Sequence, residues 1–208
     1  SAARWPESFH EEVGGAYVKE MGTTIMQKRM PGLEVVLCQR IEDATLWNTY
    51  AARRAQIRER AGVSVEDIKP ETSESIAYSA STTLDSGVNE VWLLHGTSEE
   101  CAKLISGSNF KTSEGGCFGG GIYFAEDASK SHQYAKKAAS GCSVMLLCRV
   151  ALGNMKALPK GQDRSADRFK ADPSVDSVVG NADGKHREFV VYDESQVYPE
   201  YIMYYKTT

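Results

Sequence analysis

The sequence predicts an α+β domain built on a mainly antiparallel β-sheet. Segments with strand character outnumber helical segments in the C-terminal two-thirds of the chain, and the helical segments come early. Strands and helices do not alternate regularly, as they would around a parallel sheet. The longest apolar run, residues 143–152, is rich in β-branched and long aliphatic side chains and is too short to span a bilayer. We interpret it as the central strand.

The first third of the chain contains one clear strand and one clear helix. Residues 33–40 are β-rich and predict the first firm strand, after a short helix expected over 7–20. Asp43 then stands at the N-cap of a predicted helix, in which Leu46 and Tyr50 recur at helical spacing. This helix is expected to end near residue 61, and residues 63–90 are expected to form a loop.

Short strands dominate the rest of the chain and are separated by loops and two helices. A buried strand over 91–94 runs into His95 and Gly96, and Ser98 is expected to cap a helix over 99–106. Six glycines lie between residues 107 and 121. The further elements expected are a strand over 122–125, a helix over 128–139, a loop over 156–183, and strands over 188–192 and 198–205.

Length and composition restrict the class of protein. A chain of 208 residues is one domain or one domain with a short extension. The 24 Lys and Arg against 28 Asp and Glu give a net charge of −4, which argues against a large nucleic-acid-binding surface. No run is long and apolar enough for a membrane helix, so we expect no membrane partner. We divide the chain into an N-terminal extension, 1–30, and a domain, 31–208.

The cysteines favour a reducing, intracellular setting. Five cysteines show no CxxC spacing, and the N-terminal residues have no apolar segment typical of a secretory signal. We therefore expect free thiols and an intracellular protein, with nucleus and cytoplasm left open. Zinc sites need paired Cys and His at short spacing, and that pattern is missing here. We expect no metal.

Three polar positions on predicted strands are candidates for chemistry. His95 stands at the end of a buried strand, Tyr123 follows the glycine-rich loop, and Glu188 opens an apolar strand. Burying a carboxylate such as Glu188 costs free energy unless it is paired. Taken singly, each residue also fits a structural role. The glycine cluster precedes a strand, which excludes P-loop and Rossmann nucleotide motifs.

Several segments together resemble the catalytic domain of poly(ADP-ribose) polymerases. They are Leu-His-Gly-Thr at 94–97, Phe-Gly-Gly-Gly-Ile-Tyr-Phe-Ala at 118–125, Ser-Lys-Ser-His-Gln-Tyr at 129–134, Arg-Glu-Phe-Val-Val-Tyr at 187–192 and Gln-Val-Tyr-Pro-Glu-Tyr at 196–201. Their order is that of the family, and the likeness is closest to the tankyrase branch. The resemblance implies an ADP-ribosyltransferase fold, an antiparallel split β-sheet with peripheral helices.

The resemblance also assigns catalytic residues. His95, Tyr123 and Glu188 fall on the family's His-Tyr-Glu triad. His95 would bond a ribose hydroxyl of NAD, and Glu188 would stabilise the positive charge that develops on the ribose as nicotinamide leaves. NAD is the substrate that donates ADP-ribose, and the reaction needs no metal.

Nicotinamide recognition is assigned in the same way. Gly96 would offer its backbone N–H and C=O to the carboxamide, and Ser131 would add a hydroxyl. Tyr123 and Tyr134 would stack on the two faces of the ring. The glycine-rich loop, 107–120, would cover the adenosine end as the donor loop.

The expected activity is transfer of ADP-ribose from NAD to protein side chains, the chain itself included, with release of nicotinamide. Glu188 permits elongation into poly(ADP-ribose), but members with this glutamate that transfer single units also exist. Alternatives are mono-transfer to proteins or nucleic-acid ends, hydrolysis of NAD, and an inactive module that binds NAD or ADP-ribose. The tankyrase zinc insertion is missing between 134 and 143, and an auto-inhibitory helical subdomain has no room before His95. Zinc and activation by DNA breaks are therefore not expected.

Overall fold

The computed structural model describes residues 9–12, 16–60, 70, 72 and 84–207. The strands are β1 Phe9–Glu12, β2 Leu33–Glu42, β3 Glu90–Thr97, β4 Ile122–Ala125, β5 Ser143–Ala151, β6 Met155–Ala157, β7 Ser177–Gly180, β8 Glu188–Val191 and β9 Val197–Thr207. The α-helices are α1 Ala16–Gln27, α2 Ala44–Glu59, α4 Glu99–Ser108 and α5 Ala128–His132, and the short 3-10 helices are η1 Ser86–Val88, η2 Ala166–Ala171 and η3 Glu194–Gln196.

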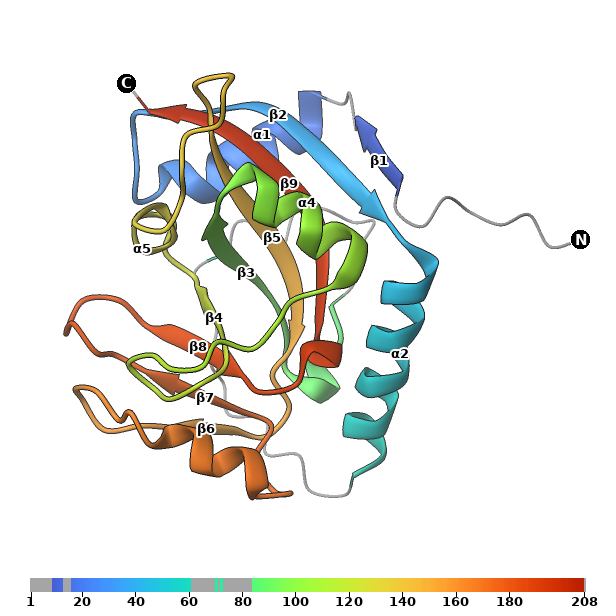
Figure 1. Cartoon of the computed structure of the whole chain (residues 1–208), viewed down its shortest axis with the longest axis vertical. Helices are drawn as coiled ribbons and strands as arrows, with labels where there is room; N and C mark the ends of the chain where they lie inside the picture. Colours follow the sequence, from blue (N-terminus) through green and yellow to red (C-terminus); the bar gives the residue numbers. More distant parts are fainter. Residues whose placement is uncertain (1–8, 13–15, 61–69, 71, 73–83, 208) are drawn as a thin grey trace, which may run out of the picture.

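The described strands form one sheet in the order β1-β2-β9-β5-β3-β4-β8-β7-β6 (Figure 1). Neighbouring strands are antiparallel throughout this set, apart from the parallel pair β6 and β7. This confirms the predicted α+β class with a mainly antiparallel sheet. The apolar run at 143–152 is β5, near the middle of the sheet, where β3 and β9 pair with its two edges.

Helices cover both faces of the central strands, which explains why β5 is apolar from Val144 to Cys148. Val144 and Leu146 on β5 belong to the hydrophobic cluster that includes Ala102 of α4. The alternate residue Met145 faces a second cluster, which includes Met26 of α1 and Ala128 of α5. Because side chains alternate across a strand, successive residues from Val144 to Cys148 enter the two cores in turn.

Two predicted helices have different bounds in the structure. The chain forms β1 at residues 9–12 and the helix α1 at 16–27, where a single helix over 7–20 was expected; residues 7–8 and 13–15 lie outside the described residues. The helix expected over 128–139 ends at His132. There the Lys136 N–H donates to the carbonyl of Thr97 on β3, so the chain turns toward the sheet before a second helical turn forms.

The region expected to be a loop over 156–183 contains β6, η2 and β7. These strands have three or four residues and carry little periodicity, so the sequence pattern is too short to reveal them. Much of the other predicted loop, 63–90, lies outside the described residues, and β3 begins within it at Glu90. The predicted N-caps Asp43 and Ser98 are confirmed, since each accepts backbone N–H groups of the helix it starts.

A buried polar network joins α2 to the central strands. Glu90 on β3 accepts hydrogen bonds from the Tyr50 hydroxyl at 2.7 Å and from Arg149 at 3.2 Å, and Arg54 lies 3.3 Å away. Arg149 also donates to Glu200 on β9 at 2.5 Å. Buried charges are tolerable only when paired, and here each carboxylate has a cationic partner.

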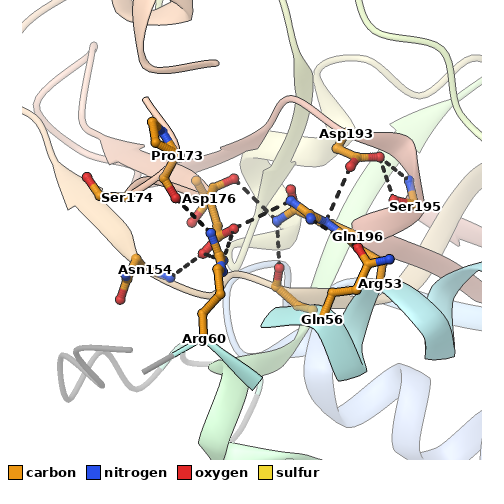
Figure 2. Close-up of polar contacts among 12 residues, drawn as sticks. Arg53, Gln56, Arg60, Asn154, Pro173, Ser174, Asp176, Asp193, Ser195 and Gln196 are labelled. Carbon is orange, nitrogen blue, oxygen red and sulfur yellow. Dashed lines mark hydrogen bonds and ion pairs between the residues drawn. The ribbon is translucent and has the colours of Figure 1, made fainter. Parts of the chain in front are cut away.

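A second polar cluster fastens the end of α2 to the region around β6 and β7 (Figure 2). The Asp176 carboxylate is buried and accepts the backbone N–H of Asn154 at 2.8 Å. Arg60 bonds both of its oxygens, and an Arg53 nitrogen lies 3.6 Å from it. Arg60 also donates to the Pro173 carbonyl at 2.9 Å. Asp176 therefore links three segments that are distant in the sequence.

We expect Asp176→Asn to destabilise the fold by about 1.5–3 kcal/mol, because the charge-assisted bonds to Arg60 and the ion pair with Arg53 are lost while the shape is kept. Urea unfolding measures this loss. Asp163→Asn is the control, because Asp163 pairs with Arg168 at the exposed surface and such pairs contribute little. Equal stability of the two variants would contradict a clamping role for Asp176.

Candidate active site

The sheet opens between β3 and β4, and a cavity lies at this opening. β3 pairs with β5 over eight positions, and β4 pairs with β8 over four, but β3 and β4 pair at Leu94 and Ala125 alone. A cavity of about 630 Å³ is lined by residues of β3, α4, the glycine-rich loop, β4, α5 and β8. Its volume is in the range typical of small-molecule sites.

Side chains bond carbonyl oxygens of the two separated strands. His95 Nδ1 lies 2.8 Å from the Tyr123 carbonyl oxygen on β4, and the Ser131 hydroxyl donates to the Leu94 carbonyl of β3 at 3.1 Å. Since a carbonyl only accepts, Nδ1 of His95 carries the proton and Nε2 is the acceptor of the neutral ring. Burial lowers the pKa of His95, with the Tyr123 bond opposing in part. The ring is therefore neutral at pH 7.

Gly96 permits α5 to pack directly on β3. A Cβ at this position would lie 1.7 Å from the carbonyl oxygen of Ser131, a distance no side chain tolerates. The backbone of Gly96 is consequently exposed to the cavity with no side chain in front of it. The missing side chain therefore explains both the close packing of α5 on β3 and the exposure of the Gly96 backbone to the cavity.

Tyr123 anchors the glycine-rich loop. Its hydroxyl accepts the backbone N–H of Phe118 at 2.9 Å and donates to the carbonyl of Gly119 at 2.5 Å. Burial raises the pKa of Tyr123 to about 12, so the phenol keeps its proton. Gly116 lies against the same ring, because a Cβ there would meet the Tyr123 oxygen at 2.4 Å. The loop thus rests on Tyr123, and several of its residues line the cavity.

Glu188 is the buried carboxylate of the cavity. It begins β8, pairs in register with Ala125 and Gly180, and is 5% exposed. Its Oε2 lies 3.4 Å from the Lys130 ammonium and, apart from this ion pair, has no hydrogen-bond donor among the described residues. Burial raises the pKa of Glu188, and Lys130 partly offsets this effect. A buried oxygen that lacks a donor is suited to accept a ligand hydroxyl.

Tyr134 and α4 form the outer part of the cavity. Tyr134 follows α5 and is 58% exposed, with the Lys130 ammonium 5.9 Å from its ring centre. On the opposite side, Leu104 of α4 is 67% exposed and contributes an apolar wall with Ile105. Phe110 follows α4 and packs edge-on against the His95 ring at 5.0 Å.

The structure brings all the predicted site residues to this one cavity, which is lined by His95, Gly96, Tyr123, Ser131, Tyr134 and Glu188. Sequence analysis did not single out Lys130, although it lies inside one of the segments that carry the resemblance. The sequence does show Lys130 directly before the candidate residue Ser131. Its contact with Glu188, 58 residues away, depends on how α5 and β8 pack.

Metal-ligating side chains do not gather in the described part of the chain. No group of three or more His, Cys, Asp or Glu is placed there to hold a metal ion. None of the helices described is long and apolar enough to cross a membrane. The five cysteines all lie in described residues and are thiols.

A split antiparallel sheet with a neutral histidine, a tyrosine and a buried glutamate around one cavity defines the ADP-ribosyltransferase class of domain. The family model of the poly(ADP-ribose) polymerase catalytic domain matches residues 16–207. The chain belongs to this family.

Curated relatives are similar over most of this chain. A probable poly [ADP-ribose] polymerase of Dictyostelium discoideum is 30% identical over 179 residues, which are 83% of this chain and 44% of the relative. The protein mono-ADP-ribosyltransferase PARP12 of Mus musculus is 28% identical over 88% of this chain and 23% of its own length. The protein mono-ADP-ribosyltransferase PARP11 of Homo sapiens is 27% identical over 85% of this chain and 52% of its own.

The chain therefore spans about half, or less, of the length of these relatives. Two of the three are named mono-ADP-ribosyltransferases, and none is named a tankyrase. The family assignment is confirmed, whereas the expected likeness to the tankyrase branch finds no support among these relatives.

We expect Gly96→Ala to destabilise the protein by about 3 kcal/mol, because the new methyl group overlaps the Ser131 carbonyl and forces α5 away from β3. Urea unfolding measures the loss. Gly115→Ala is the matched control, since a Cβ at Gly115 meets nothing within 4 Å. Similar stability of both variants would show that α5 does not pack on Gly96 as described.

Proposed function

We propose that this chain transfers ADP-ribose from NAD to side chains of proteins and releases nicotinamide. The observation that carries the proposal is Glu188, a buried carboxylate that lines the cavity, with one oxygen that has no hydrogen-bond donor among the described residues and with Lys130 beside it. A family member that has lost this chemistry needs no costly buried carboxylate at this position.

The nicotinamide end of NAD fits the inner part of the cavity. Gly96 lines the cavity and offers its backbone N–H and C=O to the carboxamide, and Ser131 lies on the neighbouring helix α5. Tyr123 and Tyr134 supply the aromatic faces for the ring. The neutral His95 presents Nε2 as the acceptor for a ribose hydroxyl. The outer cavity, with Leu104 and the glycine-rich loop, takes the adenosine end.

The chemistry at Glu188 follows from charge. The bond between the nicotinamide nitrogen and ribose C1 breaks, its electron pair moves to the positively charged nitrogen, and positive charge develops on the ribose. A fixed carboxylate at the adjacent ribose hydroxyl stabilises this charge in a site that excludes water. The acceptor oxygen then bonds to C1 and releases its proton to a base or to solvent. Lys130 keeps the carboxylate ionised before the charge appears.

We infer that the product is a single ADP-ribose unit, because PARP11 and PARP12 are named mono-ADP-ribosyltransferases. Glu188 retains the chemistry for elongation, and polymer formation is the competing outcome. Protein acceptors, the chain itself included, are the proposed partners; nucleic-acid ends are the alternative acceptor. The division into an extension, 1–30, and a catalytic domain, 31–208, and the intracellular location stay predictions.

We expect Glu188→Gln to lower nicotinamide release from NAD roughly 100-fold or more, because the amide carries no charge to stabilise the transition state. NAD affinity should stay nearly unchanged, since the amide keeps the shape and an acceptor oxygen. Release is followed with NAD labelled in nicotinamide, and affinity by calorimetry. Glu34→Gln on β2, which is exposed and does not line the cavity, is the matched control.

The same assay with NAD labelled in its ADP-ribose part separates the competing functions. One labelled protein band means mono-transfer, and a ladder means polymer. Labelled nucleic-acid ends mean the alternative acceptor, and nicotinamide release without label transfer means hydrolysis. Wild-type protein that is folded and binds NAD but releases no nicotinamide would contradict the proposal and favour a binding module.

We expect Tyr134→Ala to raise the dissociation constant of nicotinamide about threefold to tenfold. The variant loses the stacking of Tyr134 on one face of the nicotinamide ring, and such stacking contributes about 0.5–1.5 kcal/mol. Tyr134→Phe keeps the ring and should bind as the wild type does. Tyr134 is 58% exposed, so neither change should affect folding. Unchanged affinity in the alanine variant would place the ring of the ligand elsewhere.

A further inference from the structure

The turn between β7 and β8 contains a charged pair, Asp183 and His186, next to the catalytic strand. Asp183 Oδ1 accepts the backbone N–H groups of Lys185 and His186, both at 2.8 Å. Its Oδ2 lies 2.7 Å from Nδ1 of the His186 ring. The Asp183 carboxylate therefore closes the turn and holds the imidazole two residues before Glu188.

The other ring nitrogen of His186 faces the beginning of α5. Nε2 lies 3.3 Å from the Ser129 hydroxyl oxygen and 3.7 Å from Oδ2 of Asp127. The Ser129 hydroxyl donates its own hydrogen to Asp127 at 2.7 Å, so its oxygen is left to accept. Both ring nitrogens thus lie close to acceptor oxygens. His186 bridges the turn and the helix that carries Lys130.

Lys130 is shared between two carboxylates. Its ammonium lies 3.4 Å from Glu188 Oε2 and 3.9 Å from Asp183 Oδ2. Burial alone would lower the pKa of Lys130, but the attraction of Glu188, Tyr134 and Asp183 outweighs it and the pKa is raised. The ammonium is therefore a buried cation whose position depends on both carboxylates.

We propose that Asp183 and His186 are positioning residues that hold the Lys130 ammonium against Glu188 and thereby set the charge and orientation of the catalytic carboxylate. Asp183 supplies the second contact of Lys130, and His186 holds Asp183 in place while it ties the turn to α5. Neither residue lines the cavity, so both act on the substrate through Lys130 and Glu188. The role of Glu188 itself rests on the proposed function.

Asp183 and His186 have opposite effects on the pKa of Glu188. After burial, which raises the pKa of Glu188, the Lys130 cation lowers it, Asp183 raises it and His186 lowers it. Tyr123 on β4 faces the same carboxylate as a neutral phenol. Glu126, which follows β4, is held in a two-point ion pair by Arg187, and Asp127 faces His186 and Arg29.

The first test is Asp183→Asn, which keeps an acceptor for the two turn N–H groups and removes the charge. We expect kcat for nicotinamide release to fall roughly tenfold, within the ~100-fold that a 1 Å misplacement costs, while KM for NAD stays unchanged. The acid limb of the kcat profile reports the ionisation of Glu188 in the complex. It should move to lower pH, because a negative charge that raises the pKa of Glu188 is gone.

His186→Gln should move the acid limb to higher pH, because His186 lowers the pKa of Glu188 and because Asp183 loses the ring that holds it in place beside Lys130. The kcat should again fall with KM unchanged. Asp172→Asn is the matched control, since Asp172 closes a similar turn with Ser174 far from the cavity lining. It should match the wild type in every measurement.

Opposite shifts support the proposal, because a merely structural role would not reverse sign between the two variants. Wild-type kcat and profile in both variants would overturn it. Shifts of the acid limb in the same direction in both variants, together with a lowered unfolding temperature, would also overturn it. Asp183 and His186 would then have a structural role only.

Titration of the Glu188 carboxyl carbon by NMR, in protein with ¹³C-labelled glutamate and the Glu188→Gln spectrum for assignment, needs no turnover. Opposite shifts there support the positioning role even if the wild type proves inactive, which would overturn only the proposed function. Identical titration in wild type and both variants would overturn the positioning role whatever the activity.

Discussion

The site depends on one constraint, which is that backbone carbonyls at an opening in a sheet must still find donors. β3 and β4 pair at a single position, so the ladder ends where the cavity begins. His95 donates to the carbonyl of Tyr123, which lies beyond the paired position, and Ser131 donates to the carbonyl of Leu94 at that position. A buried carbonyl without a partner is costly, so the His95 bond allows β4 to separate from β3 at Tyr123. The same bonds leave Nε2 of His95 as the acceptor and orient Ser131.

The rest of the site is arranged around this opening. Because Gly96 has no side chain, α5 lies against β3 and brings Lys130 within 3.4 Å of Glu188. Tyr123 holds the glycine-rich loop with its hydroxyl and presents its ring to the cavity. The residues that hold these elements together therefore also line the cavity, so Gly96→Ala is expected to change the cavity as well as the stability.

Buried charge is distributed unequally over the molecule. Glu90 and Asp176, away from the cavity, are each held by arginines and backbone or hydroxyl donors. Glu188 has the single ammonium of Lys130, and its pKa is raised. A buried carboxylate that lacks full compensation is unfavourable for folding but reactive toward developing positive charge. The carboxylates of Glu90 and Asp176 are thus neutralised within the fold, whereas Glu188 Oε2 has no hydrogen-bond donor among the described residues.

The sequence by itself determined the α+β class, the central strand, the caps at Asp43 and Ser98, and six candidate residues that line one cavity, because periodicity, capping and ordered motifs are local signals. It did not determine β6 and β7, which are too short to show a period, or the early end of α5, where the Lys136 N–H bonds β3. The contacts of Lys130 with Glu188 and Asp183 were decided by tertiary structure alone. They join residues more than fifty positions apart, and only the packing of α5 against the β7–β8 turn brings those charges together.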